Sequence, residues 1–186
     1  MPSVDQSPLV HALCLPGASS VTVRPADPHD ADVIQAYIRE LPRASRYNRF
    51  LGAVNELSPS QLRGMTHTNR RDRLSVIAET VVAGARVMIG EACYALDPDG
   101  RSCEIALSVA AAWQRRTLGT RLVGILARRA KDVGIRYLVG DILRSNEAMT
   151  ALARKVGSVI TVPVEDARLI RMTKDLALLD DEPARE

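Results

Sequence analysis

A turn rich in arginine connects an apolar run to a predicted helix at Gln114–Thr120 and contains one glycine, Gly119. The first N–H groups of a helix have no partner within the helix, and together with the helix dipole they bind phosphate. Arg115, Arg116 and Arg121 add positive charge to this helix start, and a glycine lets the backbone approach a ligand closely. The segment therefore predicts a phosphate-binding turn, with an ordinary helix start and surface arginines as the alternative.

Two glutamates on neighbouring predicted strands are candidates for proton transfer. Glu104 lies before the turn, next to the apolar residues Ile105 and Leu107, and Glu91 lies on the preceding strand. A carboxylate in apolar surroundings is a better proton acceptor than one in water, which suits a general base near neutral pH. We predict Glu104 as the base and keep Glu91 in reserve. A solvent-facing glutamate paired with arginine or lysine is the other interpretation of Glu104.

Apolar periodicity predicts the elements that must position these residues. Alternation over short runs predicts strands, and apolar spacings of three and four residues predict helices. The predicted strands are Val21–Arg24, Leu74–Thr80, Val87–Leu96, Cys103–Ala110, Ile135–Ile142, Ser158–Pro163 and Ala167–Thr173. The predicted helices are Pro28–Leu41, Ser45–Gly52, Ser58–Thr66, Leu118–Val133 and Asn146–Val156.

The connections between these elements predict the sheet. Asp97–Gly100 is a strong turn signal, so the strands on either side of it form an antiparallel hairpin. A long helix separates Cys103–Ala110 from Ile135–Ile142, which predicts a parallel pair. The fold class is therefore α+β, layered α/β/α, with a mixed, mostly antiparallel sheet that contains one parallel crossover.

Length and composition predict one domain. The chain has 186 residues, of which 46% are hydrophobic, enough for one apolar core. We predict the domain over residues 21–176, between a flexible N-terminal tail at 1–20 and a C-terminal tail at 177–186. The short apolar patch Leu9–Leu15 could pack on a second subunit, so a homodimer stays open.

The same composition argues against several classes of function. Aromatic residues make up only 3% of the chain, and the net charge of +3 is spread along it, so a nucleic-acid partner is not indicated. The three cysteines show no C-x-x-C spacing, which favours reduced thiols in the cytoplasm. We see no secretory signal and no apolar run that would enter a membrane. The histidines His11, His29 and His67 are scattered, so no metal site is predicted.

From Gln114 onward the chain resembles the acetyl-CoA pyrophosphate loop of the GNAT N-acetyltransferases, whose pattern is Gln/Arg-x-x-Gly-x-Gly/Ala. Gln114 and Gly119 match this pattern, and Thr117 stands where the family usually has its first glycine. Asn146, with Gly157 further on, is similar to the family motif on the helix that flanks the cofactor. Within the family the chain looks most like the acetyltransferase domain of bacterial protein lysine acetyltransferases.

The resemblance implies acetyl-CoA as co-substrate, no metal, the GNAT acyl-CoA N-acyltransferase sheet and a catalytic base at Glu104. It implies that backbone groups at the end of the strand before the turn bind the pantetheine amides, where a β-bulge commonly splays the sheet. The cofactor-binding residues implied in this way are Leu107, Ser108, Val109, Gln114, Arg115, Arg116, Thr117, Leu118, Gly119, Thr120 and Asn146. Asn146 is interpreted equally well as a helix N-cap.

The predicted function is acetyl-CoA-dependent transfer of an acetyl group to a primary amine, on a protein lysine or a small molecule, by direct attack. Because the pKa of a lysine amine is about 10.4, a base must remove a proton before the amine attacks. The alternative is a non-catalytic GNAT-like module that senses acyl-CoA. It is motivated by Thr117 and by Ala153, which stands where many members have a tyrosine that protonates the thiolate. A partner-binding arginine surface is a third hypothesis.

The segment that would build the acceptor site in this family is rich in arginine. Arg43, Arg46, Tyr47 and Arg49 fall in this segment, and the last three lie on the helix predicted at Ser45–Gly52. They could contact the acceptor or form a solvated helix face, and the sequence favours neither interpretation.

Overall fold

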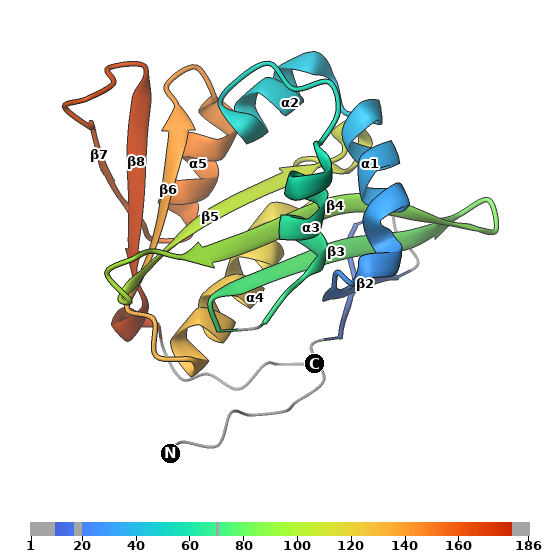
Figure 1. The fold of residues 1–186 in the computed structure, drawn as a ribbon, viewed down its shortest axis with the longest axis horizontal. Helices are drawn as coiled ribbons and strands as arrows, with labels where there is room; N and C mark the ends of the chain where they lie inside the picture. The colour runs from blue at the N-terminus through green and yellow to red at the C-terminus, as the bar shows by residue number, and fades with distance from the viewer. Residues whose placement is uncertain (1–9, 17–19, 70, 180–186) are drawn as a thin grey trace.

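The chain forms one mixed sheet with helices on both faces (Figure 1). The computed structural model describes residues 10–16, 20–69 and 71–179. The strands are β1 His11–Leu13, β2 Val21–Pro25, β3 Arg73–Val82, β4 Ala85–Leu96, β5 Ser102–Val109, β6 Tyr137–Leu143, β7 Val159–Thr161 and β8 Leu169–Asp175. The α-helices are α1 Ala31–Glu40, α2 Arg43–Phe50, α3 Pro59–Thr66, α4 Leu118–Asp132 and α5 Glu147–Lys155. Short 3-10 helices lie at Pro28–Asp30, Ala111–Trp113 and Leu176–Leu178.

The sheet has the strand order β1-β2-β3-β4-β5-β6-β8-β7 in the described part of the chain. All neighbours pair antiparallel except β5 and β6, which are parallel and are connected by α4. The predicted fold class is confirmed, including the single parallel crossover. Helix α3, predicted at Ser58–Thr66, begins with a capping box formed by Ser58 and Gln61.

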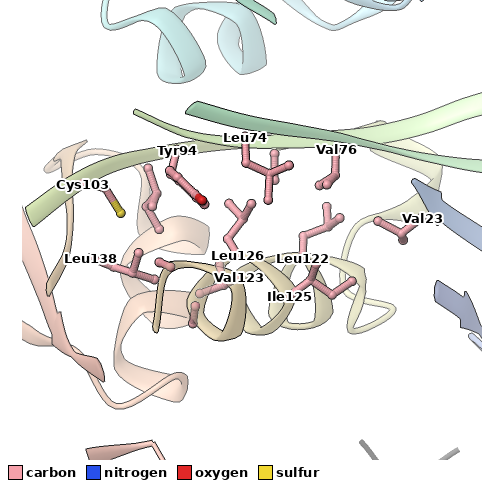
Figure 2. Packing of buried hydrophobic residues seen from close by; sticks show 14 of the residues in the cluster. Val23, Leu74, Val76, Tyr94, Cys103, Leu122, Val123, Ile125, Leu126 and Leu138 are labelled. Carbon is pink, nitrogen blue, oxygen red and sulfur yellow. The ribbon is translucent and has the colours of Figure 1, made fainter. Parts of the chain in front are cut away.

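Two apolar clusters hold the layers together. On one face, α4 packs Leu122, Val123 and Leu126 against strand residues such as Leu74 and Tyr94, all of which are buried (Figure 2). On the other face, a smaller cluster joins α1 and α3 to the sheet. A helix whose apolar residues recur every three or four positions buries one stripe, and α4 shows this most clearly.

The structure corrects the predicted domain boundaries. The predicted tail at 1–20 contains β1, whose residue His11 pairs with Val23, and it contains Leu15, which is 4% exposed. At the other end, Leu179 lies within the domain, since its carbonyl accepts a hydrogen bond from Lys131. The remaining parts of both predicted tails, 1–9, 17–19 and 180–186, lie outside the described residues. A three-residue strand has too little periodicity to be recognised beside the prolines that surround it.

Candidate active site

Strands β5 and β6 pair over only three residues each and then separate (Figure 1). The pairs join Ser102–Glu104 to Tyr137–Val139, although β5 continues to Val109 and β6 to Leu143. The result is an open edge of β5 in the middle of the sheet, at the end of the strand that leads into the arginine-rich turn.

The hydrogen bonds to β4 show which way the backbone of this open edge points. Asp97 N–H donates to Ser102 O and Ala110 N–H donates to Ile89 O, so the even-numbered residues of β5 bond to β4. The amides of Leu107 and Val109 therefore point to the β6 side, beyond the last residue pair. The carbonyl of Val109 accepts a hydrogen bond from the Gln114 side chain at 3.0 Å. An unpaired strand edge is a template for an extended ligand.

The β-bulge predicted at the end of β5 is not found there. The register between β4 and β5 runs without a break from Leu96↔Cys103 to Gly90↔Val109. The irregularity lies on the other side of β4, where Ala78 pairs with Gly90 and Glu79 with Met88. The sheet opens at this site because β6 turns away from β5, and not because β5 bulges.

The predicted phosphate-binding turn connects β5 to the start of α4. Arg115 and Thr117 adopt left-handed backbone conformations, with φ of 60° and 68°. A turn with left-handed residues of this kind can bind an anion through its N–H groups. The first N–H groups of α4, at Leu118, Gly119 and Thr120, lie next to these residues and have no partner within the helix. The guanidinium of Arg116 lies over the ring of Trp113, 5.0 Å from its centre.

Thr117 and Gly119 have structural roles in the turn in addition to the predicted contact with the cofactor. The Thr117 hydroxyl donates to the carbonyl of Arg116 at 2.6 Å, so this hydrogen is not available to a phosphate. Its left-handed conformation is the one that a glycine adopts without strain. A Cβ on Gly119 would lie 3.2 Å from the Leu152 side chain, so this glycine allows α4 to pack against α5. Packing, and not only access for a ligand, requires a glycine at residue 119.

Glu104 is exposed, which corrects the apolar surroundings expected for it. Side chains alternate along a strand, and Cys103 and Ile105 point into the α4 cluster. Glu104 therefore points to the opposite face, on the same side as Ser108 and Glu91. Cys103 is a core thiol, and burial raises its pKa to about 12. The hydrogen bonds from Arg171 to Asp141 raise the pKa of that guanidinium, and the charge of Glu104 adds to this effect.

Glu91 lies at the centre of a buried polar group. Its side chain is 2% exposed and accepts two hydrogen bonds from Arg49, at 2.7 and 3.0 Å. Ser108 donates to the same carboxylate at 2.6 Å, and the Tyr37 hydroxyl lies 3.2 Å from Ser108 Oγ. Arg49 also donates to the Cys93 sulfur at 3.4 Å. We refer to Tyr37, Arg49, Glu91, Cys93 and Ser108 as the Glu91 network.

Burial and charge act together on the members of the Glu91 network. Burial lowers the pKa of the Arg49 guanidinium, but the charges of Glu91 and Cys93 and the hydrogen bonds to both together outweigh it, so the pKa lies above its usual value. Burial, with the charge of Glu91, raises the pKa of Tyr37. Burial also raises the pKa of the Cys93 thiol. Arg49 is therefore charged, and Tyr37 is a neutral hydrogen-bond donor.

The interpretation of α2 as a solvated face is wrong for two of its arginines. The Arg49 side chain is 8% exposed in its pair with Glu91. Arg46 donates to the backbone carbonyls of Arg39, Leu41 and Val54. The sequence did not identify Arg49 or Tyr37 as a partner of Glu91, because a pair separated by 42 residues leaves no local pattern.

The second motif serves the structure of α5. The Asn146 side chain accepts a hydrogen bond from the Met149 N–H at 3.2 Å, so Asn146 is the N-cap of α5. Residue 153 is an alanine, where many family members have a tyrosine, and it is fully buried in the α4 cluster.

Within the described ranges, no group of three or more His, Cys, Asp or Glu side chains could hold a metal ion. Over the same ranges, every helix is too short or too polar to cross a bilayer.

The comparisons with known proteins agree on one family. The family described as the acetyltransferase (GNAT) domain matches residues 20–159. An acetyltransferase of Pseudomonas aeruginosa is 27% identical over 139 residues, which cover 75% of each chain. The solved GNAT domain of S. lividans PAT superimposes with a TM-score of 0.81 at 22% identity, covering 90% of this chain and 97% of that one.

Two further solved structures share the fold. The acetyltransferase yncA of Salmonella typhimurium, determined with acetyl-CoA, gives a TM-score of 0.60 at 20% identity, over 89% of this chain and 99% of that one. The cAMP-binding acyltransferase of Mycobacterium smegmatis gives 0.61 at 19% identity, and the match covers 94% of this chain and 50% of that one.

Proposed function

Because the chain belongs to the GNAT acetyltransferase family, we propose that it transfers the acetyl group of acetyl-CoA to a primary amine. The observation that carries this proposal is the open edge of β5 directly before the start of α4. It offers backbone groups for an extended ligand and, at its end, the N–H groups at the start of α4 for phosphate. A CoA thioester has both parts in this order.

In this proposal the pyrophosphate binds at Gln114–Thr120 and the pantetheine amides follow the backbone of Leu107–Val109. The exposed arginine Arg115 and the N-terminus of α4 supply positive charge. Asn146 supports the site by fixing the start of α5, on which Gly119 packs. The protein lysine and the small amine stay open as acceptors.

Glu104 is the proposed base. It is exposed, it lies on the strand that would hold the thioester, and it shares a sheet face with Ser108. A carboxylate that is open to solvent can take the ammonium proton through a water molecule. The neutral amine then attacks the thioester carbonyl, the carbon–sulfur bond breaks, and the second proton of the nitrogen passes to the leaving thiolate, so CoA leaves as the thiol. Glu91 is a poorer candidate because Arg49 and Ser108 already occupy its oxygens.

The substitution Glu104→Gln tests this assignment. We expect kcat for amine acetylation to fall by about 10²- to 10⁴-fold, while calorimetry gives an unchanged Kd for acetyl-CoA. Glu165→Gln is the matched control, because it removes an exposed carboxylate whose charge also acts on Arg171. The assay uses lysine peptides and a panel of small amines. Full activity in Glu104→Gln would contradict the assignment.

Charge reversal in the turn tests the cofactor site. Gly119→Glu is unsuitable because it would also disturb the packing on Leu152. Arg115 is exposed, so Arg115→Glu changes the charge with little effect on packing. We expect a rise of at least about tenfold in the Kd for acetyl-CoA, larger at low salt. Arg154→Glu, in the last turn of α5, makes the same change away from the turn and should leave Kd within about twofold.

A non-catalytic acyl-CoA sensor is the second candidate function. The strained Thr117 and the buried Ala153 favour it, because both depart from the family pattern at the cofactor site. A sensor would bind acetyl-CoA, lose binding in Arg115→Glu and acetylate no amine of the panel. Acetyl transfer that disappears in Glu104→Gln would exclude it.

A further inference from the structure

Helix α2 is held in place partly by charged hydrogen bonds, of which the pair between Arg49 and Glu91 reaches the sheet. Its sequence is mostly polar, and Phe50 is its one residue among the apolar side chains packed on the smaller cluster. Arg46 ties its first turn to three backbone carbonyls. Arg49, in its last turn, reaches down to β4 and pairs with Glu91. The position of α2 over the sheet therefore depends on a buried ion pair.

The hydrogen bonds around Glu91 all run toward it. An ionised carboxylate can only accept, and it accepts from Arg49 Nε, Arg49 Nη2 and Ser108 Oγ. Since Ser108 donates to Glu91, Tyr37 must be the donor in the 3.2 Å contact with Ser108. One carboxylate thus fixes α1 through Tyr37, α2 through Arg49, and β5 through Ser108. Bidentate arginine pairs of this kind fix direction as well as distance.

The Glu91 network lies next to the part of β5 that would bind the cofactor in the proposed reaction. Ser108 lies between Leu107 and Val109, whose backbone would hold the pantetheine arm. Helix α2 contacts β5 and lies near the end of β6, where the two strands are apart (Figure 1). An amine that reaches the thioester from this face has α2 at its side. The helix and the thioester strand are therefore held in register by the same carboxylate.

We propose that Glu91 is a positioning residue that, through Arg49, fixes α2 as a rigid wall of the acceptor site. The proposal rests on the proposed function and adds to it the residue that sets the approach of the amine. Glu91 acts through Arg49 and Ser108 and touches neither the acetyl group nor the amine. The base remains Glu104, on the same sheet face but exposed to solvent.

The test is Glu91→Gln, which keeps the size of the side chain but removes its charge. We expect KM for the amine to rise by at least about tenfold, because a small misplacement of a reactant is costly. The Kd for acetyl-CoA should stay within about twofold. Hydrogen exchange of the α2 amides should accelerate by at least about tenfold, since a helix held by fewer bonds opens more often.

Glu79→Gln is the matched control. Glu79 is also a buried glutamate on the α1–α3 face, where it accepts from Arg24 at 2.8 Å. Its loss should lower stability and leave both the α2 exchange and the amine KM unchanged. A general loss of stability would change the α2 exchange and the amine KM in both variants, whereas a positioning role of Glu91 would change them in Glu91→Gln alone.

A double variant separates anchoring from stability. Arg49→Met with Glu91→Leu replaces the ion pair by apolar side chains of similar volume, which are often as stable or more stable. We expect its stability to match the unsubstituted protein while amine KM stays raised, because methionine and leucine give no directional bonds.

Three results would overturn the proposal. The first is a Glu91→Gln protein with a lower kcat, an altered pH profile and an unchanged amine KM, since Glu91 would then be the base. The second is unchanged α2 exchange in that variant. The third is a normal amine KM in the double variant. If the unsubstituted protein binds acetyl-CoA but acetylates no amine, the proposed function fails, and α2 exchange still decides whether Glu91 anchors the helix.

Discussion

On the face covered by α4 the sheet buries leucine, isoleucine and valine side chains, whereas on the face covered by α1–α3 it buries two glutamates. Glu79 pairs with Arg24, which also pairs with Asp30, and Glu91 pairs with Arg49. The α4 face gains stability from apolar area, which has no direction. The α1–α3 face also contains bonds that fix individual atoms relative to one another. The candidate reaction site opens on this second face, where a reaction would require the reacting groups to be placed accurately.

The largest effect is expected from breaking a pair on the polar face. Arg49→Ala leaves Glu91 charged and buried without its partner, so we expect the free energy of unfolding to fall by about 3–5 kcal/mol. Urea unfolding followed by circular dichroism measures this. The double replacement Arg49→Met with Glu91→Leu should recover most of the loss. A loss below about 1 kcal/mol in Arg49→Ala would mean that water replaces the guanidinium.

A slightly smaller effect is expected on the apolar face. Leu126 is fully buried in the α4 cluster (Figure 2), and Leu126→Ala should cost about 2–5 kcal/mol through lost burial and the cavity left behind. Unlike the ion pair, this loss has no partner substitution that restores it. The acetyl-CoA Kd and the amine KM, measured well below the unfolding temperature, should not change. A changed amine KM would show that the two faces are coupled.

A gain in the free energy of unfolding is expected from a substitution in the turn between β5 and α4. Thr117 is a β-branched residue at φ 68°, a conformation that costs about 1–3 kcal/mol outside glycine. Thr117→Gly removes this strain but adds freedom to the unfolded chain, so the expected net gain is about 1 kcal/mol. Differential scanning calorimetry checks it. Ala83 has a φ of 50° in the β3–β4 turn, and Ala83→Gly is the control at a site without the proposed ligand.

The smallest effect is a pH dependence on the α4 side. Burial, followed by the charges of Arg129 and Arg128, lowers the pKa of His11 from 6.5. The unfolded chain therefore binds a proton that the folded protein does not, and stability falls as pH drops through about 6.5. Asp30, on the other face, has a pKa lowered from 3.8 by Arg24, so its contribution is lost only at lower pH. Urea midpoints between about pH 7.5 and 5.5 should decline, and His11→Gln should flatten this slope.

The control for the pH series is His29→Gln, because His29 is exposed. It should leave the slope of the unsubstituted protein in place. An equal slope in His11→Gln would assign the decline to another group.

The apolar face was the more predictable part of the sequence. The stripe of α4 repeats every three or four residues, and a helix between two strands implies a parallel pair, so both the helix and the crossover were predicted correctly. The Glu91 network was not predicted, because a polar side chain carries no sign of the distant residue that it meets. Arg49 in a polar helix looks like a surface residue until the fold brings it onto Glu91.

The expectation for Glu104 shows a second limit. The apolar residues Ile105 and Leu107 suggested apolar surroundings for the carboxylate, and its direct neighbours Cys103 and Ile105 are indeed buried. On a strand, however, adjacent residues occupy opposite faces, so neighbours in the sequence are the residues that Glu104 does not touch. The position of the turn at Gln114–Thr120 was predicted correctly because the signals of a helix start are local. Its strained residues were not, since φ depends on the path between β5 and α4.

The short seam between β5 and β6 has a consequence for the lifetime of the protein. Three residue pairs are the backbone link between the β1–β5 part of the sheet and the β6–β8–β7 part. A cofactor that lines the open edge of β5 would act as an additional strand and close this gap. Its binding energy would then add to folding as RT ln(1 + [L]/Kd), about 2.7 kcal/mol at a hundredfold excess over Kd. Cells short of that cofactor would hold the protein in its less stable form, and proteases would remove it sooner.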